Sequence, residues 1–143
     1  MKNTLFIFLF VLCACKGQKE TQSQTLIPEL SQETKTGLRK YFKESSYKIF
    51  LSPKETYLLL ISEATGDVSQ PRIKQVFVVL RQSDQNVQYS GQIELGTITW
   101  FSDNELEIFQ EPGIFPKDRT KDDFTYILNL ETQERIKKTQ YEN

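Results

Sequence analysis

The pattern of apolar and polar residues divides the chain into a leader, a polar stretch, a helical segment and a series of strand-like segments. Eight apolar residues run without interruption from Leu5 to Leu12, and residues 16–27 are then dominated by Lys, Gln, Thr, Ser and Glu. From Pro28 to about Ser45, apolar residues recur every three to four positions, which predicts an amphipathic helix. Because Gly37 weakens this segment, a shorter helix that begins after Thr36 is the alternative.

After the helix the period changes to that of β-strands, in which successive side chains point to opposite faces. Two segments, Thr56–Ser62 and Val76–Leu80, are apolar almost throughout and are expected to be central strands. Ser90–Gly91 is expected to form a bulge, and Thr139–Asn143 is expected to fray. The remaining strands are expected at Tyr47–Leu51, Val87–Leu95, Thr97–Phe101, Glu105–Phe109 and Phe124–Leu130, with a short one around Ile136.

Short strands with a turn about every ten residues are typical of an antiparallel meander. We therefore expect a mainly β fold of the α+β class. A curved sheet or partly closed barrel of about seven strands would carry one N-terminal helix. Residues 28–143 are long enough to form this single domain.

The leader has the features of a secretory signal, because Lys2 precedes the apolar run and small residues follow it. The run is shorter than the roughly 20 residues that a helix needs to cross a bilayer. Leu12-Cys13-Ala14-Cys15 then gives an aliphatic residue, two small residues and a cysteine. This segment resembles the lipobox of bacterial lipoproteins. The resemblance implies cleavage between Ala14 and Cys15 and a lipid on the Cys15 sulfur, which would anchor the protein in a membrane.

Residues 16–20, Lys-Gly-Gln-Lys-Glu, are similar to the surface-export signals of Bacteroidota lipoproteins, although they contain one acid where a cluster is usual. The resemblance implies an outer-membrane lipoprotein of the cell envelope, with the periplasmic or surface-facing side left open. We expect a signal peptide at 1–14, the lipidated cysteine and a flexible tether at 15–27, and the domain at 28–143. The alternative is a secreted protein without lipid, in which Cys13 and Cys15 are incidental.

The composition excludes several kinds of catalytic and metal site. The chain has no histidine, and its two cysteines are Cys13 and Cys15. Ser-His-Asp and Cys-His systems, and zinc sites of imidazole or thiolate, are therefore excluded from the domain. Without the leader, whose only charge is Lys2, 17 basic and 19 acidic residues remain, which argues against nucleic-acid binding. No cofactor is expected.

Three carboxylates, Asp103, Glu105 and Glu107, lie on or beside one expected strand. Residues two apart on a strand are roughly 7 Å apart, within the separation of about 5 to 9 Å that glycosidases use. A small carboxylate-dependent hydrolase acting on a glycan is therefore one hypothesis. Any solvated strand face gives the same pattern, and we favour that interpretation.

The loop after residue 110 places Ile114 and Phe115 between two prolines. Exposed, this pair would suit insertion into a pocket of a partner protein; the alternative is a loop that folds back over an open barrel end. The acids that follow, Asp118, Asp122 and Asp123, lack the glycine-turned pattern of calcium loops, and no metal site is expected.

Trp100, with Phe101, Tyr89 and Tyr57, could form an aromatic floor for a small apolar ligand or a sugar ring. Core packing is the favoured alternative, because Trp100 occupies an inward-looking strand position. We expect a lipid-anchored envelope protein that acts as a non-enzymatic binding or accessory module for a partner protein or a small apolar ligand. The hydrolase remains the alternative function.

Overall fold

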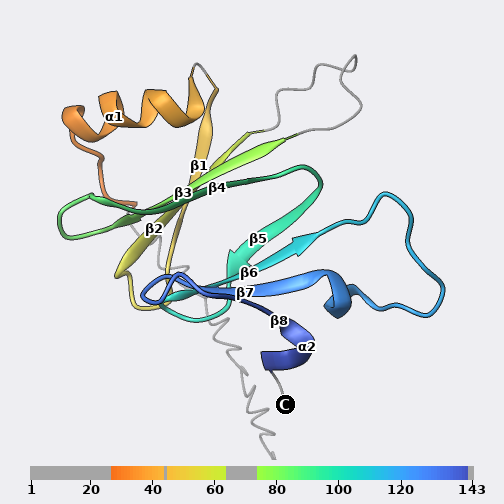
Figure 1. The fold of residues 1–143 in the computed structure, drawn as a ribbon. Helices are drawn as coiled ribbons and strands as arrows, with labels where there is room; N and C mark the ends of the chain where they lie inside the picture. Colours follow the sequence, from red (N-terminus) through yellow and green to blue (C-terminus); the bar gives the residue numbers. More distant parts are fainter. Residues whose placement is uncertain (1–26, 44, 64–73, 142–143) are drawn as a thin grey trace, which may run out of the picture.

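The computed structural model describes residues 27–43, 45–63 and 74–141 (Figure 1). The leader, the lipobox and nearly all of the tether lie outside these residues. The helices are α1 (Gln32–Phe42), a 3-10 turn η1 (Lys121–Phe124) and α2 (Lys138–Tyr141). The strands are β1 (Tyr47–Leu51), β2 (Tyr57–Ser62), β3 (Gln75–Arg81), β4 (Val87–Ile93), β5 (Gly96–Trp100), β6 (Glu105–Gln110), β7 (Thr125–Asn129) and β8 (Arg135–Lys137).

The expectation of a mainly β fold is confirmed, but that of one curved sheet or partly closed barrel is wrong. The eight strands form two antiparallel sheets, and in each the strands follow chain order: sheet A is β1-β2-β3-β4 and sheet B is β5-β6-β7-β8. The described residues form no closed barrel, because neither sheet pairs its first strand with its last and no strand pairs across the two sheets. The chain leaves sheet A after β4. Gly96 makes this exit with a φ of 146°, a backbone conformation that residues with a side chain rarely adopt.

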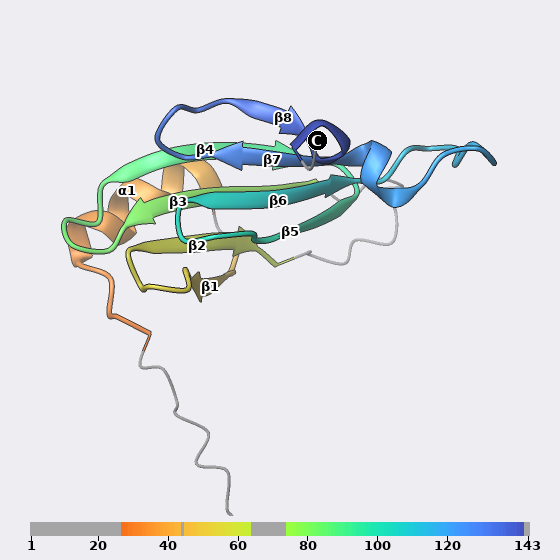
Figure 2. The ribbon, with the colours of Figure 1, turned by 90° about the horizontal axis from the view of Figure 1, so that it is seen from below.

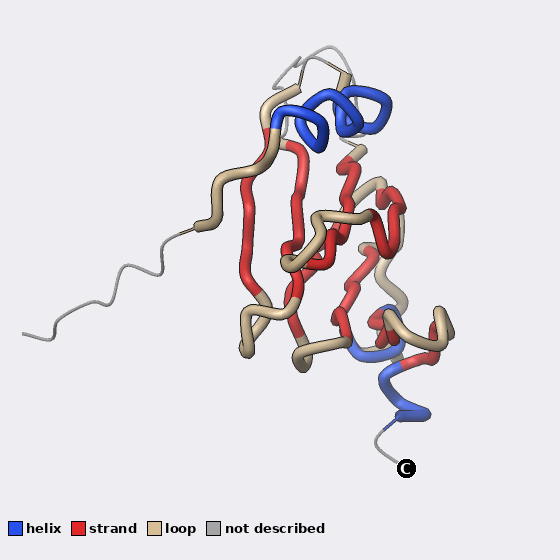
Figure 3. Tube along the Cα trace, turned by 90° about the vertical axis from the view of Figure 1, so that its left-hand side faces the viewer, coloured by secondary structure: helices blue, strands red, loops and turns tan. Residues whose placement is uncertain are grey.

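Figure 1 shows four layers from top to bottom: α1, sheet A, sheet B and α2. Figure 3, seen from the side, places α1 and α2 at opposite ends of the molecule. None of the helices in the described part of the chain is long and apolar enough to cross a membrane.

Two apolar cores explain the continuous apolar runs of β2 and β3. One face of sheet A packs on sheet B, and the other packs on α1, so both faces of these strands are buried. The inner core contains Leu59, Phe77, Val79 and Ile93 from sheet A with Ile98, Leu106, Ile108, Leu128 and Leu130. The outer core contains Leu58, Leu60, Val78 and Leu80 with Leu30, Leu38 and Phe42 from the helical side.

Helix α1 is present but shorter than expected. The Ser31 side chain caps it by accepting a hydrogen bond from the Thr34 backbone N–H at 3.1 Å, which sets its start after Pro28. The helix ends at Phe42, because the next residue, Lys43, has a φ of 53°. Gly37 lies inside the helix, so the alternative start after Thr36 is wrong.

The bulge expected at Ser90–Gly91 lies elsewhere. Val79 pairs with Tyr89 and Leu80 with Val87, so the extra residue of β4 is Gln88. Gly91 has a different role, because a Cβ atom there would lie 2.8 Å from the ring of Phe77.

The expectation that the C-terminal residues fray is wrong as far as Tyr141, because Lys138–Tyr141 forms α2. Its side chains bind groups of sheet B that are distant in sequence. Phe124, which was expected to begin a strand, is the last residue of η1.

Candidate functional site

An open cleft with a volume of about 620 Å³ lies between the inner face of sheet A and strand β5. Lys48 and Phe50 of β1 and Ile61 of β2 line one side, and Gly96–Trp100 lines the other. Glu63, just after β2, also contributes to the wall. The cleft therefore combines aliphatic and aromatic side chains with one cation and one anion.

The cleft exists because the two sheets are offset from each other. In β1, the side chains of Tyr47, Ile49 and Leu51 pack toward α1, so those of Lys48 and Phe50 point to the opposite face. Viewed from below, β1 lies beyond β5, the edge strand of sheet B (Figure 2). Sheet B thus ends before it covers β1, and 45% of Phe50 is exposed.

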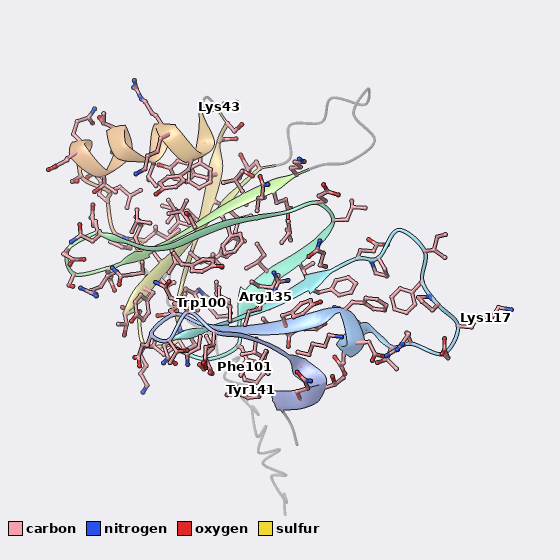
Figure 4. All side chains as sticks on the ribbon, viewed as in Figure 1. Lys43, Trp100, Phe101, Lys117, Arg135 and Tyr141 are labelled. Carbon is pink, nitrogen blue, oxygen red and sulfur yellow. The ribbon has the colours of Figure 1, made fainter. Side chains whose placement is uncertain are left out.

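Trp100, the last residue of β5, lines the cleft and contacts β1 (labelled in Figure 4). Its indole Nε1 donates a hydrogen bond to the Phe50 carbonyl oxygen at 3.3 Å. The Tyr57 ring stacks on it, with 6.3 Å between ring centroids. Trp100 is therefore both a core residue and a wall of the cleft.

The aromatic floor expected from the sequence is only partly assembled. Trp100 and Tyr57 are together, but Tyr89 stacks on Phe77 at 5.9 Å between ring centroids instead. Neither tyrosine lines the cleft; the second aromatic residue of its lining is Phe50. Phe50 was not singled out from the sequence. A signal was present, because β1 has apolar residues on both of its faces, which indicates an apolar contact on each.

The Asp103 carboxylate holds the turn between β1 and β2. Its Oδ1 accepts hydrogen bonds from Ser52 Oγ and the Lys54 backbone N–H, both at 2.8 Å. Burial raises the pKa of this carboxyl, but hydrogen bonds from Ser52, Thr56 and Lys54 outweigh it and hold the pKa below the ordinary value of 3.8. Asp103 is therefore ionised at neutral pH, which is the wrong state for a general acid.

Glu105 and Glu107 share the outer face of sheet B, where they hold α2 rather than line the cleft. Glu105 accepts hydrogen bonds from Ser102 Oγ at 2.8 Å and from the Tyr141 hydroxyl at 3.2 Å. Glu107 Oε2 lies 2.9 Å from Lys138 Nζ. The three carboxylates singled out in the sequence thus serve two separate structural contacts.

The loop from residue 111 to residue 120 extends away from the body at the right of Figure 1. Ile114 is 86% exposed and Phe115 is 48% exposed, with the Phe115 ring 5.2 Å from that of Phe124. The loop does not fold back over an open end of the sheets.

The acids after this loop bind protein groups. Asp123 Oδ1 lies 3.1 Å from Arg119 Nη1 and Asp122 Oδ1 lies 3.5 Å from Lys138 Nζ. Across the described residues, no group of three or more His, Cys, Asp or Glu residues is placed to hold a metal ion.

Comparisons of the chain with protein-family models, with curated proteins and with solved structures found no match. What the protein does must therefore be inferred from its own surfaces. The cleft is a concave surface with the exposed ring of Phe50 and the half-buried ring of Trp100. The loop from residue 111 to residue 120 projects two exposed apolar side chains, Ile114 and Phe115.

Proposed function

We propose that this protein is a lipid-anchored, non-enzymatic binding module of the bacterial cell envelope, and that the cleft beside Phe50 and Trp100 holds its partner. The observation that carries the proposal is an exposed phenylalanine facing an open volume of about 620 Å³. Binding sites commonly have volumes of about 300 to 1,000 Å³ and apolar walls with a few polar groups. The anchor on Cys15 rests on the resemblance of residues 12–15 to a lipobox.

The contacts of the carboxylates support binding over catalysis. A glycan hydrolase needs one carboxyl with a raised pKa as the acid and a second carboxylate across an open site. Asp103 has a lowered pKa, and Glu105 and Glu107 are bonded to the C-terminal helix on the opposite side of sheet B from the cleft. The three carboxylates therefore stabilise the fold, and none of them has the setting that a glycan hydrolase needs.

The loop carrying Ile114 and Phe115 supports a second contact with the same partner. Ile114 is the most exposed of the large apolar side chains described in the chain. An apolar side chain on a projecting loop can fill a pocket of another protein.

The proposal is tested by crosslinking the full chain in its native envelope and identifying captured proteins. We expect a captured membrane or periplasmic protein with the natural chain and none with Phe50→Lys. The matched control is Val87→Lys, because Val87 is 41% exposed on β4, the opposite edge of sheet A. Circular dichroism checks that both variants fold.

Two outcomes would change this assignment. Capture that survives Phe50→Lys but is lost in the double variant Ile114→Ser, Phe115→Ser would move the contact from the cleft to the loop. Failure of the natural chain to capture any protein would refute the proposed function.

A further inference from the structure

Strand β5 is an edge strand, and its backbone hydrogen-bonding groups are open on the side of the cleft. Phe101 N–H donates to Glu105 O and Glu111 N–H donates to Leu95 O, both at 2.9 Å. Antiparallel pairing alternates, so the odd-numbered residues of β5 bond to β6. The N–H and C=O groups of Gly96, Ile98 and Trp100 therefore point away from β6, and the described residues supply no partner for them.

The space beside β5 has the position that a further strand of sheet B would occupy. Packed sheets lie about 10 Å apart and neighbouring strands about 4.8 Å apart. Because β1 overhangs β5, a strand added next to β5 would lie opposite β1 (Figure 2). It would cover the exposed ring of Phe50 and the partly exposed Ile61.

The opposite end of the sandwich is protected from such an addition. There β8 overhangs β4 (Figure 2), and its inward side is occupied by Arg135 and Lys137. The Arg135 guanidinium lies 4.0 Å from the Tyr126 ring centroid. Inward-pointing charges of this kind block strand addition, whereas β1 presents Phe50.

The charges of the cleft define the chemistry of its occupant. Of the residues that line it, Lys48 and Glu63 are charged, and Lys48 Nζ lies 3.6 Å from Glu63 Oε1. Glu63 also accepts a hydrogen bond from Ser46 Oγ. Because the cation and the anion neutralise each other, a complementary occupant presents uncharged side chains to the cleft.

We propose that the cleft binds an extended segment of the partner protein, which joins sheet B as a fifth strand beside β5. Its backbone pairs with Gly96, Ile98 and Trp100, and its apolar side chains, at every second position, pack on Phe50 and Ile61. With three pairing residues on β5, the segment needs about five residues. This inference rests on the proposed function and specifies the chemistry of the partner.

The test is a selection of random twelve-residue peptides by display on the full chain in phospholipid nanodiscs. We expect the enriched peptides to share apolar residues at positions i, i+2 and i+4. Trp100, the only tryptophan of the chain, lies in the cleft and reports binding of each synthetic peptide by fluorescence. Phe50→Lys should weaken binding at least about tenfold, and Val87→Lys should leave it unchanged.

Matched N-methylated peptides test the strand itself. In an extended peptide, the amide N–H groups of every second residue point to the same side. One peptide is methylated on the amides that would face β5, which removes these donors. The other is methylated on the remaining amides, which leaves them intact. We expect a loss of affinity of at least about tenfold for one set and less than about twofold for the other. Equal effects of the two sets, enriched peptides without alternation, or no enriched peptide would overturn the inference.

The two proposals fail in different ways. If an envelope protein is captured through Phe50 but peptides do not bind as strands, the proposed function stands and the strand addition is wrong. If peptides pair with β5 as described but no envelope protein is captured, the strand addition stands and the proposed function is wrong.

Discussion

Two glycines of this chain have opposite effects on its stability. Gly96 has a φ of 146°, and a Cβ atom there would overlap the carbonyl oxygen of Phe109 on β6. Gly37 lies in α1, where an added Cβ atom would meet no atom within 4 Å. The first glycine is required by the geometry that separates the two sheets, and the second only loosens a helix.

The same substitution should therefore change the free energy of unfolding in opposite directions at these positions. We expect Gly96→Ala to lower it by about 3 kcal/mol or more, because the strained backbone and the overlap both have to be relieved. Gly37→Ala should raise it by about 0.5 to 1 kcal/mol, since alanine favours the helix. Urea unfolding of both variants measures the difference, and changes of the same sign would contradict this account.

At the scale of elements, α2 is a four-residue helix that could not persist by itself and is held by side chains. The Tyr141 ring meets Phe101 edge to face, with 5.3 Å between centroids (Figure 4). A hydrogen bond to Glu107 raises the pKa of Lys138 above 10.5, despite an opposing effect of burial. Burial, followed by the charge of Glu105, raises the pKa of Tyr141 above 10.0.

The docking of α2 should weaken at alkaline pH. Both groups have a higher pKa in the folded state, so their contribution is complete below the unfolded pKa and is lost as the pH rises through the folded pKa. The free energy of unfolding should therefore fall above about pH 10. In the double variant Lys138→Met, Tyr141→Phe this fall should be smaller. Urea unfolding between about pH 8 and 11.5 tests this, and parallel curves for the two proteins would refute it.

Besides its apolar packing on sheet A, helix α1 is joined to the sheet by a side chain in the turn after β3. Gln85 Oε1 accepts hydrogen bonds from the Ser31 backbone N–H at 2.8 Å and from Thr34 Oγ1 at 2.9 Å. Its Nε2 donates to the Glu29 carbonyl oxygen at 3.1 Å. A single residue thus binds three groups at the start of the helix.

Gln85→Ala should lower the free energy of unfolding by about 1 to 3 kcal/mol, because these three groups lose their partner. Hydrogen exchange of the α1 amides should speed up more than that of β6. The control is Gln92→Ala on the exposed face of β4, for which we expect a change within about 0.5 kcal/mol. If both variants lose equal stability, the Gln85 contacts are not what holds the helix.

The sequence predicts well those elements that are specified by the apolar pattern within their own residues. Strand β1 spans Tyr47–Leu51 as expected, and the apolar runs of β2 and β3 indicate burial on both faces. Helix α2 could not be predicted, because its Tyr141 and Lys138 depend on Glu105 and Glu107, which lie 36 and 31 residues earlier in the chain. The separation into two sheets was equally inaccessible, since a spacing of strands does not reveal the positive φ of Gly96.

The sequence predicts the part of the candidate site that depends on a local pattern, and not the part that depends on how the sheets pack. The inward position of Trp100 follows from the alternation of β5. The exposure of Phe50 depends on how far sheet B extends beneath β1, which is a property of packing and not of any one strand.

For the whole molecule, the proposed anchor gives a simple test. Cys15→Ala removes the thiol to which the lipid would be attached, so the protein should move from the membrane fraction to the soluble fraction. Cys13→Ala is the matched control and should remain with the membrane, because alanine is also small. Membrane association of Cys15→Ala equal to that of the natural chain would exclude the anchor. Fractionation followed by immunoblotting measures both variants.

The double burial of sheet A has a consequence for the newly made chain. Strands β2 and β3 need α1 on one face and sheet B on the other, and sheet B is made of residues that follow them in the sequence. Until those residues are available, two β-prone apolar segments stay exposed, which favours aggregation. Lys74 and Arg81 flank the second segment as gatekeeper charges. We therefore expect the newly made chain to need protection from aggregation until residues 96–137, which form sheet B, have been added.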